Sequence, residues 1–248
     1  MLSPKPWRIE TVLQFCGAQL FCFCLGVLIA GLLQRAGIAA FQAPYGFGAV
    51  LLGTLGFQGA TLALAPVFLR QHQLGWREAF GLNRPDFRRT LGLAGLLTLA
   101  LLPVVLGLQV VSAELLVRVG WLPQEQLAVT LLTGSKSWWL RVYLALFAVA
   151  LAPVAEEFIF RGILYPFVKQ LGYPRLAWIG VSLAFALVHD DAAAFVPLFV
   201  LALALTWFYE MTDNLLAPIA AHALFNAANL MLLLLLDVSA AQHPPGHE

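Results

Sequence analysis

The sequence predicts an all-α membrane protein whose chain crosses the bilayer several times. Hydrophobic residues make up 61% of the 248 residues and charged residues only 11%, whereas a soluble domain contains about 25% charged residues. The mean hydropathy is +0.84, and apolar stretches of the length that a membrane helix needs, about 20 residues, recur along the chain. These observations exclude a cytosolic enzyme, a disordered regulator and a secreted scaffold held by disulfides.

About seven apolar segments are expected to be transmembrane helices. Six or eight transmembrane helices are also possible, because the sequence does not decide whether the stretches 120–137 and 162–175 cross the membrane. The first of these is expected to lie along the membrane interface and the second to carry a short amphipathic helix. The first apolar segment is long and is followed by further spans, so it is expected to persist rather than to be cleaved as a signal peptide. The predicted spans are 12–33, 45–69, 90–117, 139–160, 176–189, 194–209 and 215–236.

One continuous domain is expected, because no internal repeat or linker interrupts the chain. It consists of N-terminal helices with a polar loop in residues 1–137, a core in residues 138–236 and a polar tail in residues 237–248. The three cysteines fall in one apolar run and predict neither a disulfide framework nor a metal site. A net charge of +1 gives no basic surface that would attract nucleic acid.

The distribution of basic residues predicts the orientation in the cell membrane. Ten of the 14 Lys and Arg residues lie in the N-terminal tail, in the loop after the second span and in the loop after the fourth span. Cytoplasmic loops carry the excess of basic residues in membrane proteins. The amino terminus is therefore expected to be cytoplasmic.

Ionisable groups inside membrane helices are costly and indicate function. Glu157 and Arg161 are four residues apart on one helical face and are expected to form an ion pair. Glu156 points elsewhere and is free to face a cavity as a general base. Taken singly, each polar residue also has an ordinary structural explanation, such as a hydrogen bond that ties two helices together. Their concentration favours a site between the fourth, fifth and seventh spans, and its members are Glu156, Glu157, Arg161, Phe185, His189, His222 and Asn226.

The patterns E-E-x-x-x-R, F-x-x-x-H and H-x-x-x-N follow one another on successive predicted helices within residues 138–236. In this order they resemble the CAAX protease and bacteriocin-processing (CPBP) family of intramembrane proteases, which includes the type II CAAX prenyl proteases and many bacterial Abi-type proteins. The pattern W-x-x-x-x-G-L over residues 76–82 is similar to one that many bacterial members carry.

The resemblance implies an intramembrane endopeptidase that cleaves a membrane-associated, prenylated or leader peptide. It implies that Glu156 and His189 activate a water molecule and that His222 and Asn226 stabilise the oxyanion. Glu157, Arg161 and Phe185 would support these side chains. The family also allows a metal-dependent mechanism in which Glu156, His189 and His222 bind zinc. The sequence carries no H-E-x-x-H pattern, and no cofactor is assigned from it.

Two other functions stay open. A non-catalytic accessory or immunity protein would keep the fold and hold a partner. A small proton-coupled transporter would use Glu156 and His189 as a relay, although the sequence has no inverted repeat. Counted along the helices at about 1.5 Å per residue, Glu156 and His222 are expected to lie shallower than His189. For these side chains to meet, the fifth helix must therefore start late, tilt or break.

Overall fold

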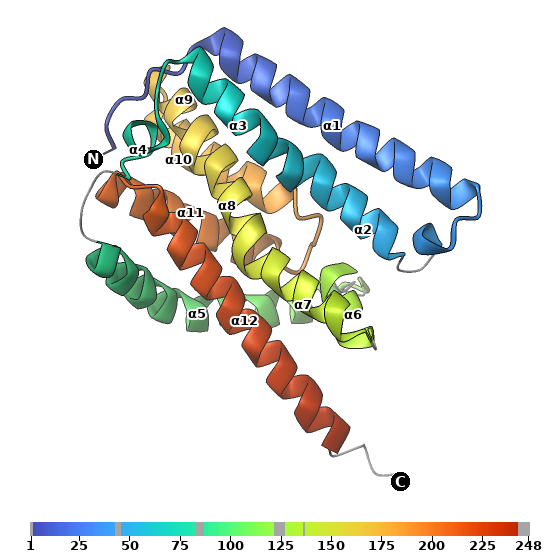
Figure 1. Ribbon diagram of the computed structural model, residues 1–248. Helices are drawn as coiled ribbons and strands as arrows, with labels where there is room; N and C mark the ends of the chain where they lie inside the picture. Colours follow the sequence, from blue (N-terminus) through green and yellow to red (C-terminus); the bar gives the residue numbers. More distant parts are fainter. Residues whose placement is uncertain (1, 43–45, 83–86, 122–126, 136, 243–248) are drawn as a thin grey trace.

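The computed structural model describes residues 2–42, 46–82, 87–121, 127–135 and 137–242. These residues form helices and turns with no strand among them (Figure 1). Six of the described helices are long and apolar enough to cross a membrane, which confirms the predicted all-α membrane fold and the expected range of spans. The helices are α1 (Ile9–Arg35), α2 (Phe47–Thr54), α3 (Ala60–Gln71), α4 (Trp76–Ala79), α5 (Phe87–Arg118), α6 (Leu127–Gly134), α7 (Trp138–Leu146), α8 (Ala152–Glu157), α9 (Tyr165–Gln170), α10 (Pro174–Leu187), α11 (Phe195–Thr212) and α12 (Leu216–Gln242).

Two of the spans are composite. The π-helical turn Leu55–Gly59 joins α2 to α3, and the π-helical turns Phe147–Leu151 and Phe158–Leu164 join α7, α8 and α9 into one helix, Trp138–Gln170. A short 3₁₀ turn, Ala39–Phe41, follows α1. Within the predicted interfacial stretch 120–137, residues 122–126 and 136 lie outside the described residues. The predicted tail begins as the end of α12, and residues 243–248 are also outside the description.

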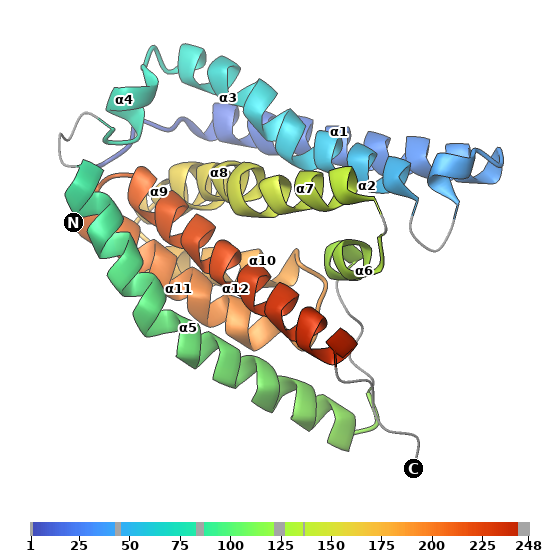
Figure 2. The same cartoon turned by 60° about the horizontal axis from the view of Figure 1, so that its bottom comes forward.

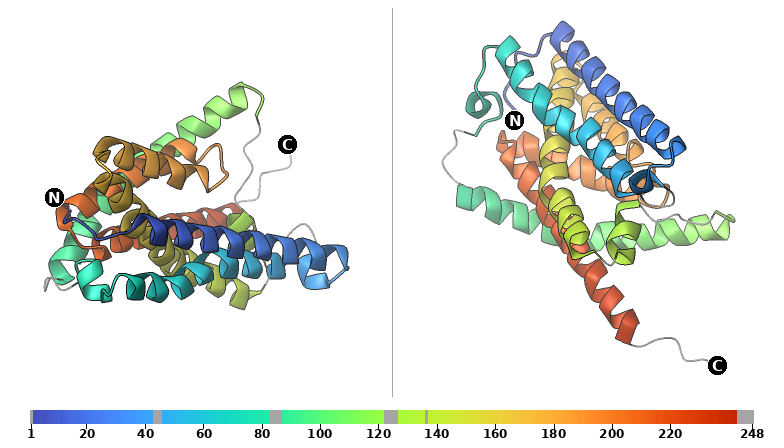
Figure 3. Two further views of the ribbon diagram at one scale, coloured as in Figure 1. Left: turned by 90° about the horizontal axis from the view of Figure 1, so that it is seen from above. Right: turned by 45° about the vertical axis from the view of Figure 1, so that its right-hand side comes forward.

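The Trp138–Gln170 helix separates two groups of helices, as Figures 1 and 2 show. On one side α1 packs along α2 and α3, and on the other side α5, α10, α11 and α12 pack against one another. Viewed from above, α1 and the α2–α3 helix lie together along one edge of the molecule (Figure 3). Large apolar side chains such as Phe21 on α1 and Leu99 on α5 are exposed, as expected where lipid is the solvent. The central helix packs against both groups, so it is well placed to carry a buried site.

The central helix is longer than predicted. The sequence predicts an end near residue 160, but the helix continues through Gly162 and Pro166 to Gln170. A π turn precedes Pro166, and the Trp7 indole donates to Gly162 O, four residues before this proline, at 2.9 Å. Gly162 allows the Phe80 ring to approach, since a Cβ there would lie 3.1 Å from that ring. The predicted end was therefore wrong, and residues 162–170 of the second ambiguous stretch belong to this span.

The extra length changes the expected depth of the site. A short turn joins Gln170 to Pro174. Along the chain, Glu156 lies about as far before Gln170 as His189 lies after Pro174. Because α10 has 14 residues, it spans about 21 Å, less than the roughly 30 Å of a bilayer core. His189, in the loop after α10, therefore lies at about the same depth as Glu156, and α10 need not start late or break.

The W-x-x-x-x-G-L pattern packs against the turn between α11 and α12. Gly81 has a φ of +68°, and a Cβ at this position would lie 1.9 Å from Asp213 O. Only glycine fits such an approach without a shift of the backbone. The N–H of Leu215 donates to Phe80 O at 3.0 Å, which fixes the loop to the start of α12. The N-terminal residues lie at this same end of the molecule (Figure 1).

Candidate active site

The side chains singled out in the sequence come from three helices that meet at the middle of the molecule. The Trp138–Gln170 helix packs on α12 through α8 and on α10 through the π turn Phe158–Leu164. α8 and this π turn carry Glu156, Glu157 and Arg161, α10 and its following loop carry Phe185 and His189, and α12 carries His222 and Asn226. The site thus involves the fourth, fifth and seventh predicted helices.

Glu157 and Arg161 form the predicted ion pair. Arg161 Nη1 donates to Glu157 Oε1 at 2.8 Å, and both side chains are 0% exposed. The guanidinium also donates from Nη2 to Ala202 O at 3.0 Å and from Nε to Thr206 Oγ1 at 3.3 Å. Its Cζ lies 4.6 Å from the centre of the Phe185 ring, a cation–π distance. Arg161 therefore ties the central helix to α11 and α10 as well as neutralising Glu157.

His222 contacts both glutamates, an arrangement that the sequence did not reveal. Its Nδ1 donates to Glu157 Oε1 at 2.8 Å, and its Nε2 lies 3.8 Å from Glu156 Oε2. The ring is 3% exposed and packs edge-on against Phe185, at 5.7 Å between the ring centres. A carboxylate that accepts from one ring nitrogen fixes the orientation of the other. Glu157 thereby directs His222 Nε2 toward Glu156.

Glu156 is in a more open environment than Glu157. Its side chain is 12% exposed, and within the described part of the chain it makes no hydrogen bond. His222 and His189 both lie within electrostatic range of it. His189 Nδ1 contacts Phe185 O at 2.7 Å, and the Phe185 ring lies 4.7 Å from the imidazole. Because Nδ1 is engaged with a carbonyl, Nε2 is the nitrogen of His189 left to act on a substrate or a water molecule.

Asn226 caps a carbonyl group of the central helix. In the π turn Phe147–Leu151, Phe147 O accepts from Ala152 N–H, five residues later. With the same spacing Ala148 O would face the nitrogen of Pro153, which carries no hydrogen. Asn226 Nδ2 donates to Ala148 O at 2.9 Å. One of the two amide hydrogens of Asn226 is used in this way, and one is left.

The zinc alternative was tested on the placement of the possible ligands. Among the residues that the structure describes, no group of three His, Cys, Asp or Glu side chains is arranged to hold a metal ion. Zinc takes ligand nitrogen and oxygen atoms at about 2.0–2.2 Å. Glu156, His189 and His222 therefore do not fit a zinc site as they are placed.

A protein-family model matches the part of the chain that carries these side chains. The family model described as Type II CAAX prenyl endopeptidase Rce1-like matches residues 137–228. The match includes every site residue from Glu156 to Asn226 and confirms the resemblance to the CPBP family. No curated protein and no solved structure matches the chain. The chain is a multi-pass membrane protein similar to these proteases, and the similarity supports intramembrane endopeptidase activity in general.

Proposed function

We propose that this protein is an intramembrane endopeptidase in which Glu156 is the general base. The observation that carries the proposal is the contrast between the two adjacent carboxylates. Glu157 is fully buried and accepts from Arg161 and His222, whereas Glu156 is partly exposed and has no hydrogen bond within the described residues. A general base needs unshared electron pairs that can reach a proton on water. Glu156 meets this requirement.

The proposed reaction begins with a water molecule held between Glu156 and His189. Glu156 takes one proton from the water, whose oxygen attacks the carbonyl carbon of the peptide bond. The electron pair of the C=O bond moves onto its oxygen. The electron pair on that oxygen then re-forms the C=O bond as the C–N bond breaks, and the proton passes from Glu156 to the leaving nitrogen. Each of these steps uses side chains of the chain itself, and none requires a metal ion.

His222 and Asn226 are proposed to stabilise the negative charge on the carbonyl oxygen. In its imidazolium form His222 donates from both ring nitrogens, so that Nδ1 stays on Glu157 while Nε2 faces the oxyanion. Asn226 would contribute the amide hydrogen that Ala148 O does not use. Donors already fixed by the protein require no rearrangement when the charge develops. The hydrogen bonds to Glu157 and Ala148 are the contacts that would fix them.

The substrate is proposed to be a membrane-associated peptide, with or without a prenyl group. The test is to incubate purified protein in liposomes with matched prenylated and unprenylated peptide libraries and to identify the products by mass spectrometry. Cleavage that is lost in Glu156→Gln supports the proposal. Peptide binding without cleavage by the intact protein would favour the accessory function. Peptide-independent proton flux that depends on Glu156 and His189 would favour the transporter.

The amino terminus is proposed to be cytoplasmic. The N-terminal residues, α4 and the end of α9 lie at one end of the molecule (Figure 1), and these are regions rich in Lys and Arg. α12 runs from this end toward the opposite one. A reporter that is active only in the cytoplasm should therefore work when fused before residue 1. A periplasmic phosphatase should work when fused after residue 242, and the reverse pattern would contradict this orientation.

A further inference from the structure

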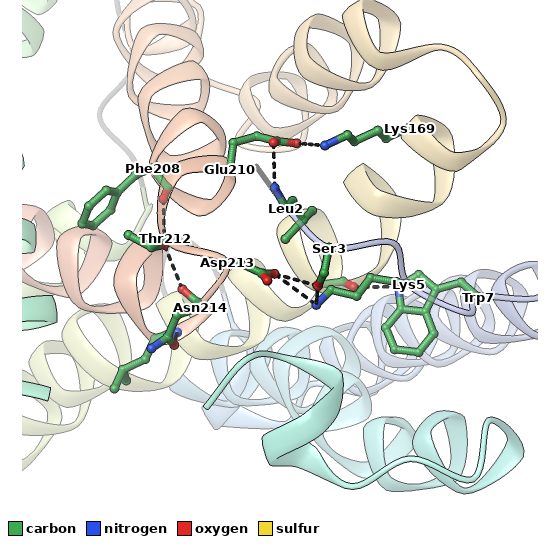
Figure 4. A network of polar contacts seen from close by, with 12 residues as sticks. Leu2, Ser3, Lys5, Trp7, Lys169, Phe208, Glu210, Thr212, Asp213 and Asn214 are labelled. Carbon is green, nitrogen blue, oxygen red and sulfur yellow. Dashed lines mark hydrogen bonds and ion pairs between the residues drawn. The ribbon is translucent and has the colours of Figure 1, made fainter. Parts of the chain in front are cut away.

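The N-terminal segment, residues 2–8, is packed into the molecule, although the sequence indicated only a basic tail there. The N–H of Leu2 donates to Glu210 Oε2 at 3.0 Å. Lys5 Nζ lies 3.4 Å from Asp213 Oδ1, and the two side chains are 4% and 9% exposed. Figure 4 shows these contacts at the end of α11, where Lys169 of α9 also pairs with Glu210. The segment is therefore anchored to the end of α11.

Trp7 makes the contact of this segment that bears on the candidate site. Its side chain is 3% exposed and packs against Phe68 and Phe80, with ring centres at 5.0 and 6.2 Å. Its indole Nε1 donates to Gly162 O at 2.9 Å. Gly162 lies four residues before Pro166, which has no N–H for an α-helical bond to this carbonyl. The indole N–H thus binds a buried carbonyl from outside the helix, at the point where the proline interrupts the helical hydrogen bonds.

The capped carbonyl is next to the ion pair of the site. Gly162 directly follows Arg161, and both belong to the π turn Phe158–Leu164. Arg161 pairs with Glu157, and Glu157 orients His222. A change in the rotation of this turn would therefore move Arg161 first and His222 through it. Asn226 holds the carbonyl of Ala148 in the same way on the other side of Glu156, so the two donors secure the helix on both sides of the site.

We propose that Trp7 is a positioning residue, which acts through Gly162 and Arg161 to set the orientation of Glu157 and His222. This inference rests on the proposed function where it concerns cleavage. The hydrogen-bond donor is the feature that matters, because an aromatic ring alone would fill the space between Phe68 and Phe80. The prediction is that removing the donor alone loosens the π turn and slows the chemical step.

The test compares Trp7→Phe with Trp178→Phe. Phenylalanine keeps an aromatic ring and removes the N–H in both variants. Trp178 Nε1 also donates to a backbone carbonyl, that of Leu203 at 3.0 Å, but the residue four positions later is Trp207, which has its own N–H. The control thus loses the same type of bond at a carbonyl that has no proline four residues later. Hydrogen–deuterium exchange of peptides covering residues 158–167 and the kinetics of cleavage are measured for each protein.

In Trp7→Phe we expect faster exchange in residues 158–167 and a fall in kcat on the order of tenfold with little change in KM, since small displacements of reacting groups have effects of this size or larger. Trp178→Phe should change neither. Unchanged exchange in Trp7→Phe, or a loss seen only in KM, would overturn the positioning role. If the intact protein cleaves no peptide, the proposed function fails, whereas the exchange measurement still decides whether Trp7 holds the π turn.

Discussion

The two sides of α8 provide different surroundings for adjacent carboxylates. On the side of Glu157, Arg161 and His222 both bind Oε1 and Phe185 packs against them, so the region is closed. Glu157 Oε2 is buried there without a hydrogen bond in the described part of the chain. On the side of Glu156, the carboxylate is partly exposed, with His222 Nε2 at 3.8 Å. One region suits charge balance and orientation, and the other suits proton transfer.

Adjacent carboxylates on one membrane helix can thus have different surroundings, which is why different roles are proposed for Glu156 and Glu157. We call the surroundings of Glu157, formed by Arg161, His222 and Phe185, the closed region, and the surroundings of Glu156 the open region. The closed region fixes the ring of His222 through Nδ1, and the same ring presents Nε2 to the open region. The structural glutamate thus prepares a partner for the other glutamate. If the comparison is correct, substitutions in the open region should change turnover, and substitutions in the closed region should change stability as well.

The largest effect is expected for Glu156→Gln. It should lower kcat by about 10²–10⁴-fold, the usual contribution of a general base, while the midpoint of thermal unfolding in detergent stays close to that of the intact protein. Chelator treatment should leave turnover of the intact protein unchanged. A loss with chelator that added zinc restores would instead show that a metal ion takes part. An active Glu156→Gln protein would remove the distinction between the two regions.

Glu157→Gln should mainly destabilise the protein. Removing one partner of a buried ion pair leaves Arg161 uncompensated and typically costs about 3–5 kcal/mol, so expression and the free energy of unfolding in SDS titrations should fall along with turnover. The matched control is Glu114→Gln on α5. Glu114 is also four residues from an arginine, Arg118, but these side chains are 67% and 73% exposed, and such pairs contribute at most about 1 kcal/mol. A Glu157→Gln protein that folds normally and has lost all cleavage would transfer the catalytic role to Glu157.

Asn226→Ala tests whether the second amide hydrogen serves the oxyanion. We expect kcat to fall about 100-fold or more with substrate affinity nearly unchanged, because an oxyanion donor acts only in the transition state. The loss of the bond to Ala148 O should add a stability cost of about 0.6–2 kcal/mol. Thr98→Val is the control, since Thr98 Oγ1 joins α5 to α12 through Ala221 O at 3.2 Å and lies outside the site. Normal turnover in Asn226→Ala would show that Asn226 only joins α12 to the central helix.

The sequence predicted the features that depend only on residues close to one another in the chain. The spans follow from the length of apolar segments, and the Glu157–Arg161 pair follows from a spacing of four residues on a helix. The patterns also located the group of side chains that the structure brings together. These features need no knowledge of how distant helices pack.

The missed features depend on contacts between distant parts of the chain. His222 reaches Glu157 across 65 positions, and Trp7 reaches Gly162 across 155. The fourth span is predicted to end near residue 160, and the sequence does not reveal the π turn and the donor from the N-terminal segment that accompany the longer helix. The capping of Ala148 O by Asn226 was missed for the same reason. Sequence alone gives no register between helices, so these partners could not be paired in advance.

The smallest effect is expected for Thr206→Val, which alters the closed region without touching either carboxylate. Valine has nearly the shape of threonine but cannot accept the bond from Arg161 Nε, which is 3.3 Å from Thr206 Oγ1. Arg161 keeps its bonds to Glu157 and Ala202 O, so the ion pair should persist. Valine also removes the bond from Thr206 Oγ1 to Ala202 O, at 2.9 Å, but this carbonyl still accepts from Arg161 Nη2. The free energy of unfolding, measured by SDS titration, should fall by about 1.5–3 kcal/mol. The value of kcat should stay within about twofold of the intact protein, because Arg161 still holds Glu157 and hence His222. A fall in kcat as large as that of Asn226→Ala would show that the closed region takes part in turnover directly, and the division of α8 into two regions would then be wrong.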